Sequence, residues 1–156
     1  MIKIIEGNLF DTTAPIIAHQ VNCQGKMGSG VAKQVREKYP LVYAQYLKFY
    51  SVFRLGDLQK VYIDDTNSKS VVNIFGQDKY GYDGNKYTNL AALTKGLFNL
   101  YNHTKKSKHI TNKRIAIPYN MGCDRGGESW DKVFYILQCI FEHDDDFVLE
   151  IWRLNK

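Results

Sequence analysis

The chain has 156 residues, of which 44% are hydrophobic and 24% charged, a composition typical of one globular domain with its own core. We therefore expect a single domain over residues 1–156. Lys and Arg together number 21 against 16 Asp and Glu, and the net charge of +5 favours anionic partners. The basic residues are scattered, however, and no nucleic-acid-binding motif is present.

Cysteine content and hydropathy exclude further classes of protein. The three cysteines are widely spaced, which argues against a disulfide framework or a zinc site and indicates a reducing compartment. No apolar run approaches the ~20 residues that cross a bilayer, and the N-terminus is typical of a strand rather than a signal peptide. We therefore expect a soluble, cytoplasmic protein that has no membrane partner and needs no metal or cofactor.

Apolar runs and helical periodicity alternate along the chain. Short runs rich in Ile, Val and Phe predict strands over residues 2–5, 16–21, 58–63, 71–75, 114–117 and 147–152. Apolar residues at helical spacing predict a helix that ends before Pro40, and helices over residues 41–53, 88–101 and 130–141, with Thr88 as an N-cap. Residues 76–86 should form a flexible loop. This order predicts a layered α/β protein, with helices on both faces of a largely parallel sheet.

Two glycine-rich loops each follow a predicted strand and precede a predicted helix. They cover residues 22–30 and 119–129, and their glycines are Gly25, Gly28, Gly30, Gly122, Gly126 and Gly127. Backbone N–H groups at a helix start lack internal partners, and glycines let a ligand approach the main chain closely. Because parallel strands end at one edge of a sheet, the loops should meet there and hold a diphosphate, with Arg125 as a forked donor.

His19 is the strongest candidate for chemistry. An imidazole near neutrality can activate water, attack phosphorus or donate a proton to a leaving sugar oxygen. Because His19 lies in an apolar strand, a buried and hydrogen-bonded structural histidine is the alternative interpretation. We interpret Cys23 as a small buried side chain rather than a nucleophile, since nothing near it in the sequence favours a thiolate.

Three segments of the chain resemble the macrodomain family. They are residues 7–10 (Gly-Asn-Leu-Phe), 19–32 (His-Gln-Val-Asn-Cys-Gln-Gly-Lys-Met-Gly-Ser-Gly-Val-Ala) and 118–130 (Pro-Tyr-Asn-Met-Gly-Cys-Asp-Arg-Gly-Gly-Glu-Ser-Trp). The resemblance is nearest to the branch of ADP-ribose 1''-phosphate phosphatases, with the terminal ADP-ribose protein glycohydrolases nearby. It implies a three-layer α/β/α macrodomain-like fold with a mixed, mostly parallel sheet that binds ADP-ribose derivatives.

The resemblance also implies roles for individual residues. Asn8 and Leu9 correspond to an adenine contact, and the two glycine-rich loops hold the diphosphate and the distal ribose. His19 would act as base or nucleophile, Asn22 would orient the distal ribose and its 1''-substituent, and Asp124 would assist catalysis. The remaining substrate contacts that it implies are Gly25, Met27, Gly28, Ser29, Gly30, Val31, Gly122, Cys123, Arg125, Gly126 and Gly127.

The sequence departs from the family pattern at three places. Asn8 stands where Asp is commoner, and its amide oxygen can accept the same hydrogen bond with less charge assistance, a simple turn residue being the alternative. Asp124 stands where bacterial relatives often have Gly, and its alternative role is to cap a turn. Gly76 and Gln77 occupy the place of the glycohydrolase lysine, and Lys79 is out of register, which argues against covalent lysine chemistry.

The resemblance thus predicts a hydrolase, an ADP-ribose 1''-phosphate phosphatase that acts as a monomer on a small-molecule ADP-ribose derivative. Three alternatives stay open at this point. The protein hydrolyses ADP-ribose from a modified protein or nucleic acid, it binds ADP-ribose without turnover, or it uses its positive charge to bind RNA or poly-ADP-ribose.

Overall fold

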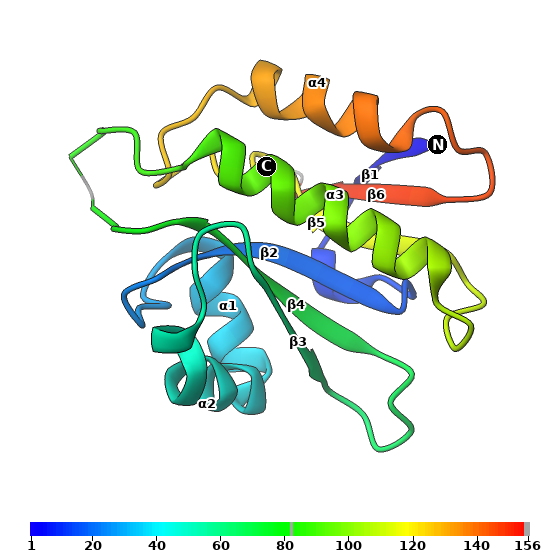
Figure 1. Ribbon diagram of the computed structural model, residues 1–156, viewed down its shortest axis with the longest axis horizontal. Coiled ribbons are helices and arrows are strands. Elements are labelled where there is room, and N and C mark those ends of the chain that lie inside the picture. The colour runs from blue at the N-terminus through cyan, green and yellow to red at the C-terminus, as the bar shows by residue number, and fades with distance from the viewer. Residues whose placement is uncertain (82, 155–156) are drawn as a thin grey trace.

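One six-stranded sheet forms the frame of the computed structural model, which describes residues 1–81 and 83–154 (Figure 1). Its strands are β1 (Ile2–Glu6), β2 (Ile16–Asn22), β3 (Leu58–Tyr62), β4 (Ser70–Gln77), β5 (Arg114–Pro118) and β6 (Val148–Arg153). They lie in the order β1-β6-β5-β2-β4-β3, and neighbouring strands are parallel except β3, which pairs antiparallel with β4. The predicted mixed, mostly parallel sheet is confirmed.

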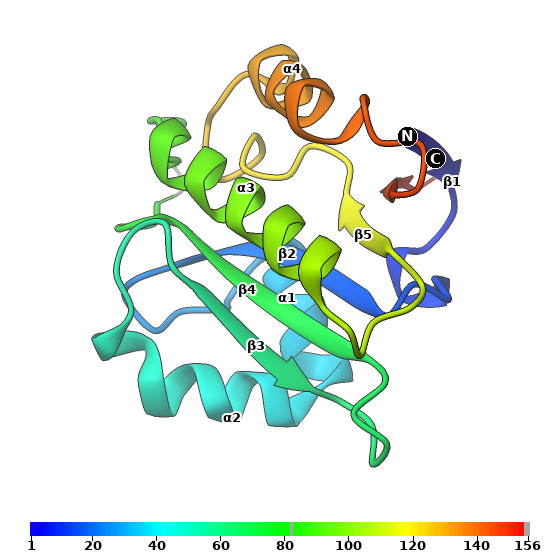
Figure 2. The same cartoon turned by 45° about the vertical axis from the view of Figure 1, so that its right-hand side comes forward.

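Helices cover both faces of this sheet. They are α1 (Gly30–Lys38), α2 (Pro40–Phe49), α3 (Leu90–Lys106) and α4 (Trp130–Phe141), with short 3₁₀ turns η1 (Leu9–Asp11) and η2 (Tyr50–Val52). Helices α1 and α2 pack on one face, and α3 and α4 pack on the other (Figure 2). In the part of the chain that the structure describes, none of the helices is long and apolar enough to cross a membrane.

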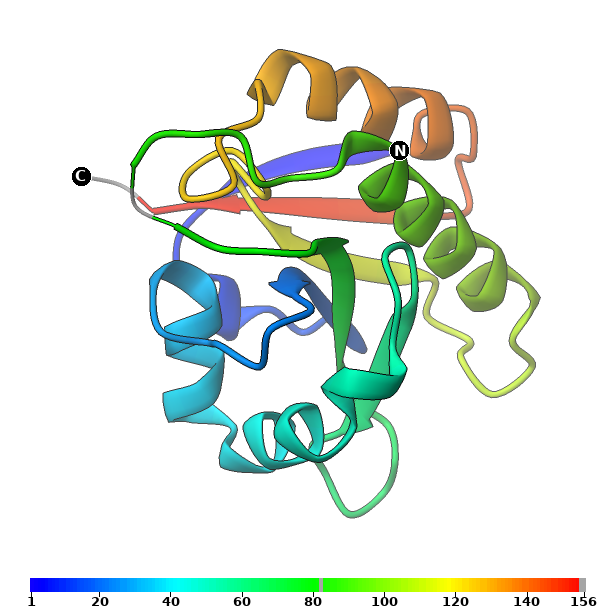
Figure 3. The same ribbon diagram turned by 60° about the vertical axis from the view of Figure 1, so that its left-hand side comes forward.

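The apolar core is divided between the two faces because side chains alternate along a strand. On β2, Ala18 belongs to the cluster beneath α3 and α4, whereas Ile17 belongs to the cluster on the side of α1 and α2. Strands β2 and β4 are buried along almost their whole length, and polar side chains such as His19 and Asn73 are buried in them together with the apolar ones. The loops that follow β2 and β5 emerge on the same side of the molecule (Figure 3).

Several predicted element ends were wrong where tertiary contacts decide them. Helix α2 ends at Phe49, and η2 continues the chain in place of the predicted last turn. Helix α3 starts after Asn89, whose side chain accepts the Ala92 N–H, and it extends to Lys106. Thr88, the expected N-cap, directs its hydroxyl elsewhere, as described below. Strand β4 continues into the predicted loop as far as Gln77.

Gly96 lets α3 approach β4 closely. A Cβ at this position would lie 2.6 Å from Ile74 Cγ2, a distance that packed carbon atoms do not reach. Ile74 is fully buried, so its methyl group cannot move into solvent. The absence of a side chain at Gly96 therefore sets the distance between the helix and the strand that leads to the site.

We predict that Gly96→Ala destabilises the protein although alanine is the better helix former. Overpacking costs about 1–3 kcal/mol, which exceeds the gain of up to about 1 kcal/mol from helix propensity. Urea unfolding of the two single variants and the double variant with Ile74→Ala checks this prediction. Gly96→Ala should cost less in the Ile74→Ala background, and equal costs in both backgrounds would contradict the close contact.

Candidate functional site

Strands β2 and β5 separate towards their carboxyl ends. They pair at Ile16–Ile115 and Ile17–Ala116, whereas β2 stays paired with β4 as far as Asn22. A cavity of about 440 Å³ lies where they part, within the usual size range of small-ligand pockets. Its lining is His19, Gln20, Val21, Asn22, Lys26, Gly28, Ser29, Gly30, Val31, Ala32, Gln77, Tyr80, Gly81, Pro118, Tyr119, Asn120, Met121, Gly122, Asp124, Arg125 and Gly126.

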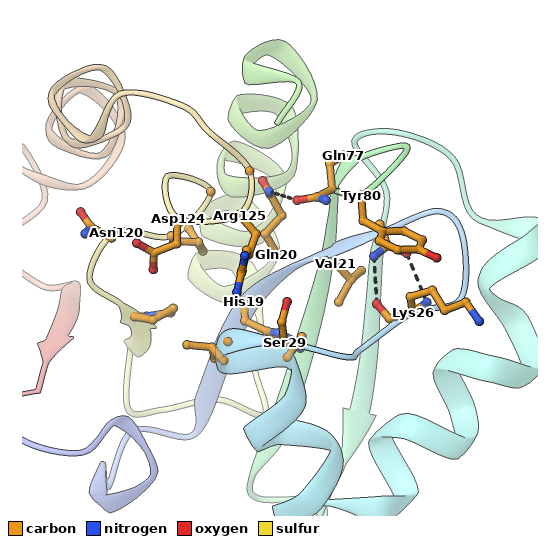
Figure 4. Close-up of a pocket in the computed structure, with 18 of the residues that line it drawn as sticks. His19, Gln20, Val21, Lys26, Ser29, Gln77, Tyr80, Asn120, Asp124 and Arg125 are labelled. Atoms are coloured by element: carbon orange, nitrogen blue, oxygen red, sulfur yellow. Dashed lines mark hydrogen bonds between the residues drawn. The ribbon is translucent and has the colours of Figure 1, made fainter. Parts of the chain in front are cut away.

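Side chains from several elements surround this cavity (Figure 4). Asn120 and Asp124 of the second glycine-rich loop lie on one side, and Lys26 and Tyr80 lie on the opposite side. His19 of β2 lies between them. Both glycine-rich loops therefore border one space at the carboxyl ends of the strands, where open α/β sheets bind their ligands.

Asn22 holds the first loop in shape. Its side-chain N–H donates to Lys26 O at 2.9 Å, and its Oδ1 accepts from the Gln24 N–H at 3.0 Å. The buried Tyr46 hydroxyl of α2 lies 2.6 Å from Asn22 O and 2.9 Å from Asn22 Oδ1, and it accepts the Gly25 N–H at 3.2 Å. An amide carries two N–H groups, so Asn22 closes the loop and still has a second donor for a ligand.

Gly25 and Met27 support the first loop from beneath. Gly25 has a φ of +77°, and a Cβ there would lie 2.8 Å from the Tyr50 ring. Met27 is 1% exposed and packs with Val21 and Phe75. Neither residue lines the cavity. The structure thus places these two predicted substrate contacts in the packing behind the loop.

The start of α1 and the two residues before it line the cavity. Gly28, Ser29, Gly30 and Val31 all line the space, and Ser29 is the N-cap. Gly30 has a φ of +59°, a conformation that glycine adopts without strain. The first N–H groups of a helix lack intrahelical acceptors and lie at the positive end of the helix dipole. This turn can therefore bind an anionic group.

The second loop is held from behind by the residues just before α3. Gly126 O accepts the N–H groups of Tyr87 at 2.7 Å and Thr88 at 2.9 Å, and the Thr88 hydroxyl donates to Gly122 O at 2.7 Å. Gly122 has a φ of +79°. A Cβ on Gly126 would overlap the Thr88 hydroxyl. Glycine at both positions lets the main chain of this loop line the cavity.

The other predicted residues of the second loop fall into two groups. Asp124 and Arg125 are exposed and line the rim of the cavity. Cys123 packs against the core cluster beneath α3 and α4, and a Cβ on Gly127 would lie 2.6 Å from Asn85 O. Cys123 and Gly127 are therefore behind the lining, and their contribution is to the shape of the loop.

Gln20 joins three segments of the site, and sequence reasoning missed it. Its Nε2 donates to Gln77 Oε1 at 2.7 Å and to Thr88 Oγ1 at 2.8 Å, and Gln77 Nε2 donates to Lys79 O at 2.8 Å. A Cβ on Gly76 would overlap the Gln20 amide. At the place of the glycohydrolase lysine, the chain thus has a confined glycine and an engaged glutamine. The available signal was a polar residue within an apolar strand.

His19 is buried in the wall of the cavity, with 1% of its surface exposed. Its Nε2 lies 2.6 Å from Asn73 Oδ1 on β4. Burial lowers the pKa of the imidazole to about 4, although the hydrogen bond to Asn73 acts in the opposite direction. The ring is therefore neutral at physiological pH. It is at once a buried, hydrogen-bonded histidine and a residue of the cavity wall.

Asn8 and Leu9 lie outside the cavity lining. Asn8 caps η1, since its Oδ1 accepts the Phe10 N–H at 2.9 Å. Leu9 is 6% exposed and packs in the cluster with Ile17 and Val35. Asn8 is thus a turn residue in this structure. The contact of Asn8 with adenine stays a prediction.

The cysteine thiols near the site are held in their protonated form. Burial, and then Asp78 and Asp57, raise the pKa of Cys23. Burial and two nearby carboxylates raise the pKa of Cys123 to about 12. Because the thiolate is the nucleophile, neither cysteine is poised for catalysis. Within residues 1–81 and 83–154, no three or more His, Cys, Asp or Glu side chains gather where they could hold a metal ion.

Solved macrodomains are similar to this structure. The macrodomain of Mycobacterium tuberculosis DarG matches with a TM-score of 0.82 at 24% identity, over 97% of each chain. Thermosipho africanus DarTG, solved in complex with ADP-ribose, matches with a TM-score of 0.81 at 20% identity, over 99% of this chain and 42% of that one. The chain has the macrodomain fold.

Sequence comparison finds two kinds of enzyme similar to this chain. A DNA ADP-ribosyl glycohydrolase of M. tuberculosis is 27% identical over 152 residues, which are 94% of this chain and 40% of that protein. An ADP-ribose 1''-phosphate phosphatase of Neosartorya fischeri is 44% identical over 43 residues, 27% of this chain and 22% of that protein. No family model matches the sequence. The resemblance to macrodomains, including both branches, is confirmed, while the chain spans about two fifths of the mycobacterial relative.

We predict that Tyr46→Phe loosens the first glycine-rich loop. The change removes the hydroxyl that Asn22 and Gly25 share, and lost buried hydrogen bonds cost about 1–3 kcal/mol. Urea unfolding should show the loss, and hydrogen exchange at the Gly25 amide should accelerate. Tyr43→Phe on the same helix is the matched control and should behave like the wild type. Unchanged exchange at Gly25 in Tyr46→Phe would contradict the assigned role.

We predict a pH dependence of stability that belongs to His19. The folded protein keeps this imidazole neutral down to about pH 4, whereas the unfolded chain takes up a proton near pH 6.5. The free energy of unfolding is therefore unaffected by protonation of His19 above pH 6.5. It falls by about 1.4 kcal/mol per pH unit as the pH decreases from 6.5 towards 4.

Urea unfolding between pH 7.5 and pH 4.5 measures this contribution. Relative to His19→Gln, the wild type should lose on the order of 2–3 kcal/mol over that interval. His103 is exposed, so His103→Gln should follow the wild type. Parallel curves for the wild type and His19→Gln would rule out a neutral, buried His19.

Proposed function

We propose that this macrodomain binds ADP-ribose derivatives between its two glycine-rich loops and hydrolyses the 1''-phosphate of ADP-ribose 1''-phosphate. The observation that carries the proposal is that the first turn of α1 and the main chain of the second loop line the same cavity of about 440 Å³. A diphosphate is a ligand suited to such paired backbone donors. The match to Thermosipho africanus DarTG in complex with ADP-ribose supports this choice of ligand.

The arrangement of the lining suggests how the ligand lies. We place the diphosphate between residues 28–31 and residues 122–126, where the main chain is accessible. The distal ribose then extends towards Asn22 and His19 at the end of β2. Arg125 at the rim contributes positive charge, which offsets the charge of the phosphates.

Hydrolysis of the 1''-phosphate consumes one water and releases ADP-ribose and inorganic phosphate. The neutral His19 imidazole can accept a proton from the attacking water, and Asn22 can hold a ribose hydroxyl or phosphate oxygen with its second N–H. Asp124 at the rim is the second proton acceptor. Because the pKa of His19 is lowered to about 4, it is a weak base, and we expect slow turnover.

A second candidate function is removal of ADP-ribose from a modified protein or nucleic acid. The match to a DNA ADP-ribosyl glycohydrolase extends over 94% of this chain, whereas the match to a phosphatase extends over 27%. Gln77 argues against covalent lysine chemistry, because it stands at the place of the glycohydrolase lysine and its Oε1 accepts a hydrogen bond from Gln20. This reaction would therefore depend on a bound water.

Calorimetric titration with ADP-ribose, followed by two product assays, tests these proposals. The first assay measures phosphate released from ADP-ribose 1''-phosphate, and the second measures ADP-ribose released from a modified DNA oligonucleotide and a modified acidic peptide. Binding with phosphate release supports the phosphatase. Binding with release of ADP-ribose supports the second candidate, and binding without either product supports a reader. Absence of binding would overturn the proposed ligand.

We predict that Gly126→Ala lowers the affinity for ADP-ribose at least tenfold, or about 1.4 kcal/mol. The new methyl group overlaps the Thr88 hydroxyl and displaces the second loop from the cavity. Gly84→Ala is the control for a strained glycine away from the cavity, because Gly84 has a φ of +79°, a Cβ there meets no neighbouring atom, and Gly84 does not line the cavity. Calorimetry on both folded variants decides the question, and equal affinities would exclude a role for the second loop in binding.

A further inference from the structure

A row of polar side chains crosses three strands beneath α2. His19 on β2 is in register with Asn73 on β4, and Asn73 is in register with Gln59 on β3. All three are buried, with 1%, 0% and 6% of their surfaces exposed. The row lies between apolar side chains, since Val71 precedes Asn73 and Phe75 follows it on the same face of β4. Three buried polar side chains stabilise the folded protein only when each donor in the row faces an acceptor.

The direction of every hydrogen bond in this row is set at its far end. Gln59 Nε2 lies 3.0 Å from Gln45 O, a backbone carbonyl that can only accept. Gln59 therefore turns its Oε1 towards Asn73, whose Nδ2 donates to it at 3.0 Å. Asn73 in turn presents Oδ1 to His19. Because an amide oxygen can only accept, the proton on the imidazole is at Nε2.

The second ring nitrogen of His19 is left as an acceptor. Nε2 is engaged with Asn73 on β4, and the His19 ring lines the cavity between β2 and β5. Nδ1 is a buried atom without a hydrogen-bond partner among the residues that the structure describes. A neutral ring nitrogen without a proton accepts hydrogen bonds from O–H and N–H groups. It cannot donate a hydrogen bond to an anionic oxygen.

We propose that Asn73 and Gln59 are positioning residues that hold His19 as its Nε2–H tautomer, so that Nδ1 accepts a hydrogen bond from a hydroxyl group or water of the bound ligand. This inference rests on the proposed function in one respect, namely that an ADP-ribose derivative occupies the cavity. It narrows the roles that the sequence left open for His19, because in this tautomer the ring cannot donate a proton from Nδ1 to a leaving oxygen. The anionic part of the ligand is then held elsewhere, by the main chain of the two loops.

Nitrogen-15 NMR of the imidazoles in the ligand-free protein tests the positioning role directly. The chemical shifts of the two ring nitrogens report which one carries the proton, and His19→Gln identifies the His19 signals. We expect protonated Nε2 and unprotonated Nδ1 at pH 7 in the wild type. Gln59→Leu frees the Asn73 amide to turn over, so protonated Nδ1 should appear.

Two further variants separate orientation from packing. Gln59→Glu keeps an acceptor for Asn73 and should keep the wild-type tautomer. Adding Asn73→Asp to Gln59→Leu supplies an acceptor that does not depend on orientation, so the proton should return to Nε2. Protonated Nδ1 in the wild type, or an unchanged tautomer in Gln59→Leu, would overturn the positioning role.

The ligand part of the proposal is tested by adding ADP-ribose to the wild type. The His19 Nδ1 signal should shift on binding, and Gln59→Leu should lower kcat for phosphate release at least tenfold while KM changes less than threefold. ADP-ribose that binds by calorimetry but leaves Nδ1 unshifted would overturn the acceptor role. Absence of ADP-ribose binding would instead overturn the proposed function together with the acceptor role, and the tautomer of the free protein would still decide the positioning role.

Discussion

The site depends on the divergence of two parallel strands. β2 and β5 pair at Ile16–Ile115 and Ile17–Ala116 and then part, while each stays paired with its other neighbour. Helices cover both faces of the sheet, so the opening lies at its edge, where both strands end in glycine-rich loops. Backbone groups at such an opening need partners. The proposed diphosphate has several acceptor oxygens and would supply such partners.

Both loops owe their shape to side chains from other elements. The Tyr46 hydroxyl of α2 holds the first loop, and the Thr88 hydroxyl before α3 holds the second. The Gln20 side chain on β2 donates hydrogen bonds to Thr88 and to Gln77. It thereby connects β2 to the segment before α3 and to the end of β4. These groups are buried or half-buried, where hydrogen bonds are strong and unpaired polar atoms are costly. The main chain that lines the cavity is thereby preorganised, which lowers the ordering cost of binding a ligand.

His19 illustrates how one residue can have a structural and a chemical character together. It interrupts the apolar packing of β2, and burial keeps it neutral. Asn73 on the neighbouring strand forms a hydrogen bond with Nε2 of the ring, and Gln59 on the next strand sets the direction of the hydrogen bonds along the row. A polar group buried in this way favours a single register of the three strands, because a shift by one residue would turn every side chain of the row to the opposite face. The same register brings the ring to the wall of the cavity.

The sequence by itself determined the layered α/β order, because the periodicity of apolar residues is local, and it located both glycine-rich loops between a strand and a helix. Its errors lie where distant groups compete for one side chain. Thr88 has the chemistry of an N-cap, but its hydroxyl bonds to Gly122 O, so Asn89 caps α3 instead. The tertiary structure alone decided which loop residues line the cavity. Met27 belongs to the first loop yet packs inward, whereas Gln20 lies inside a strand and reaches the site. The direction of a loop side chain is set by contacts with residues far away in the sequence, and no local pattern records them.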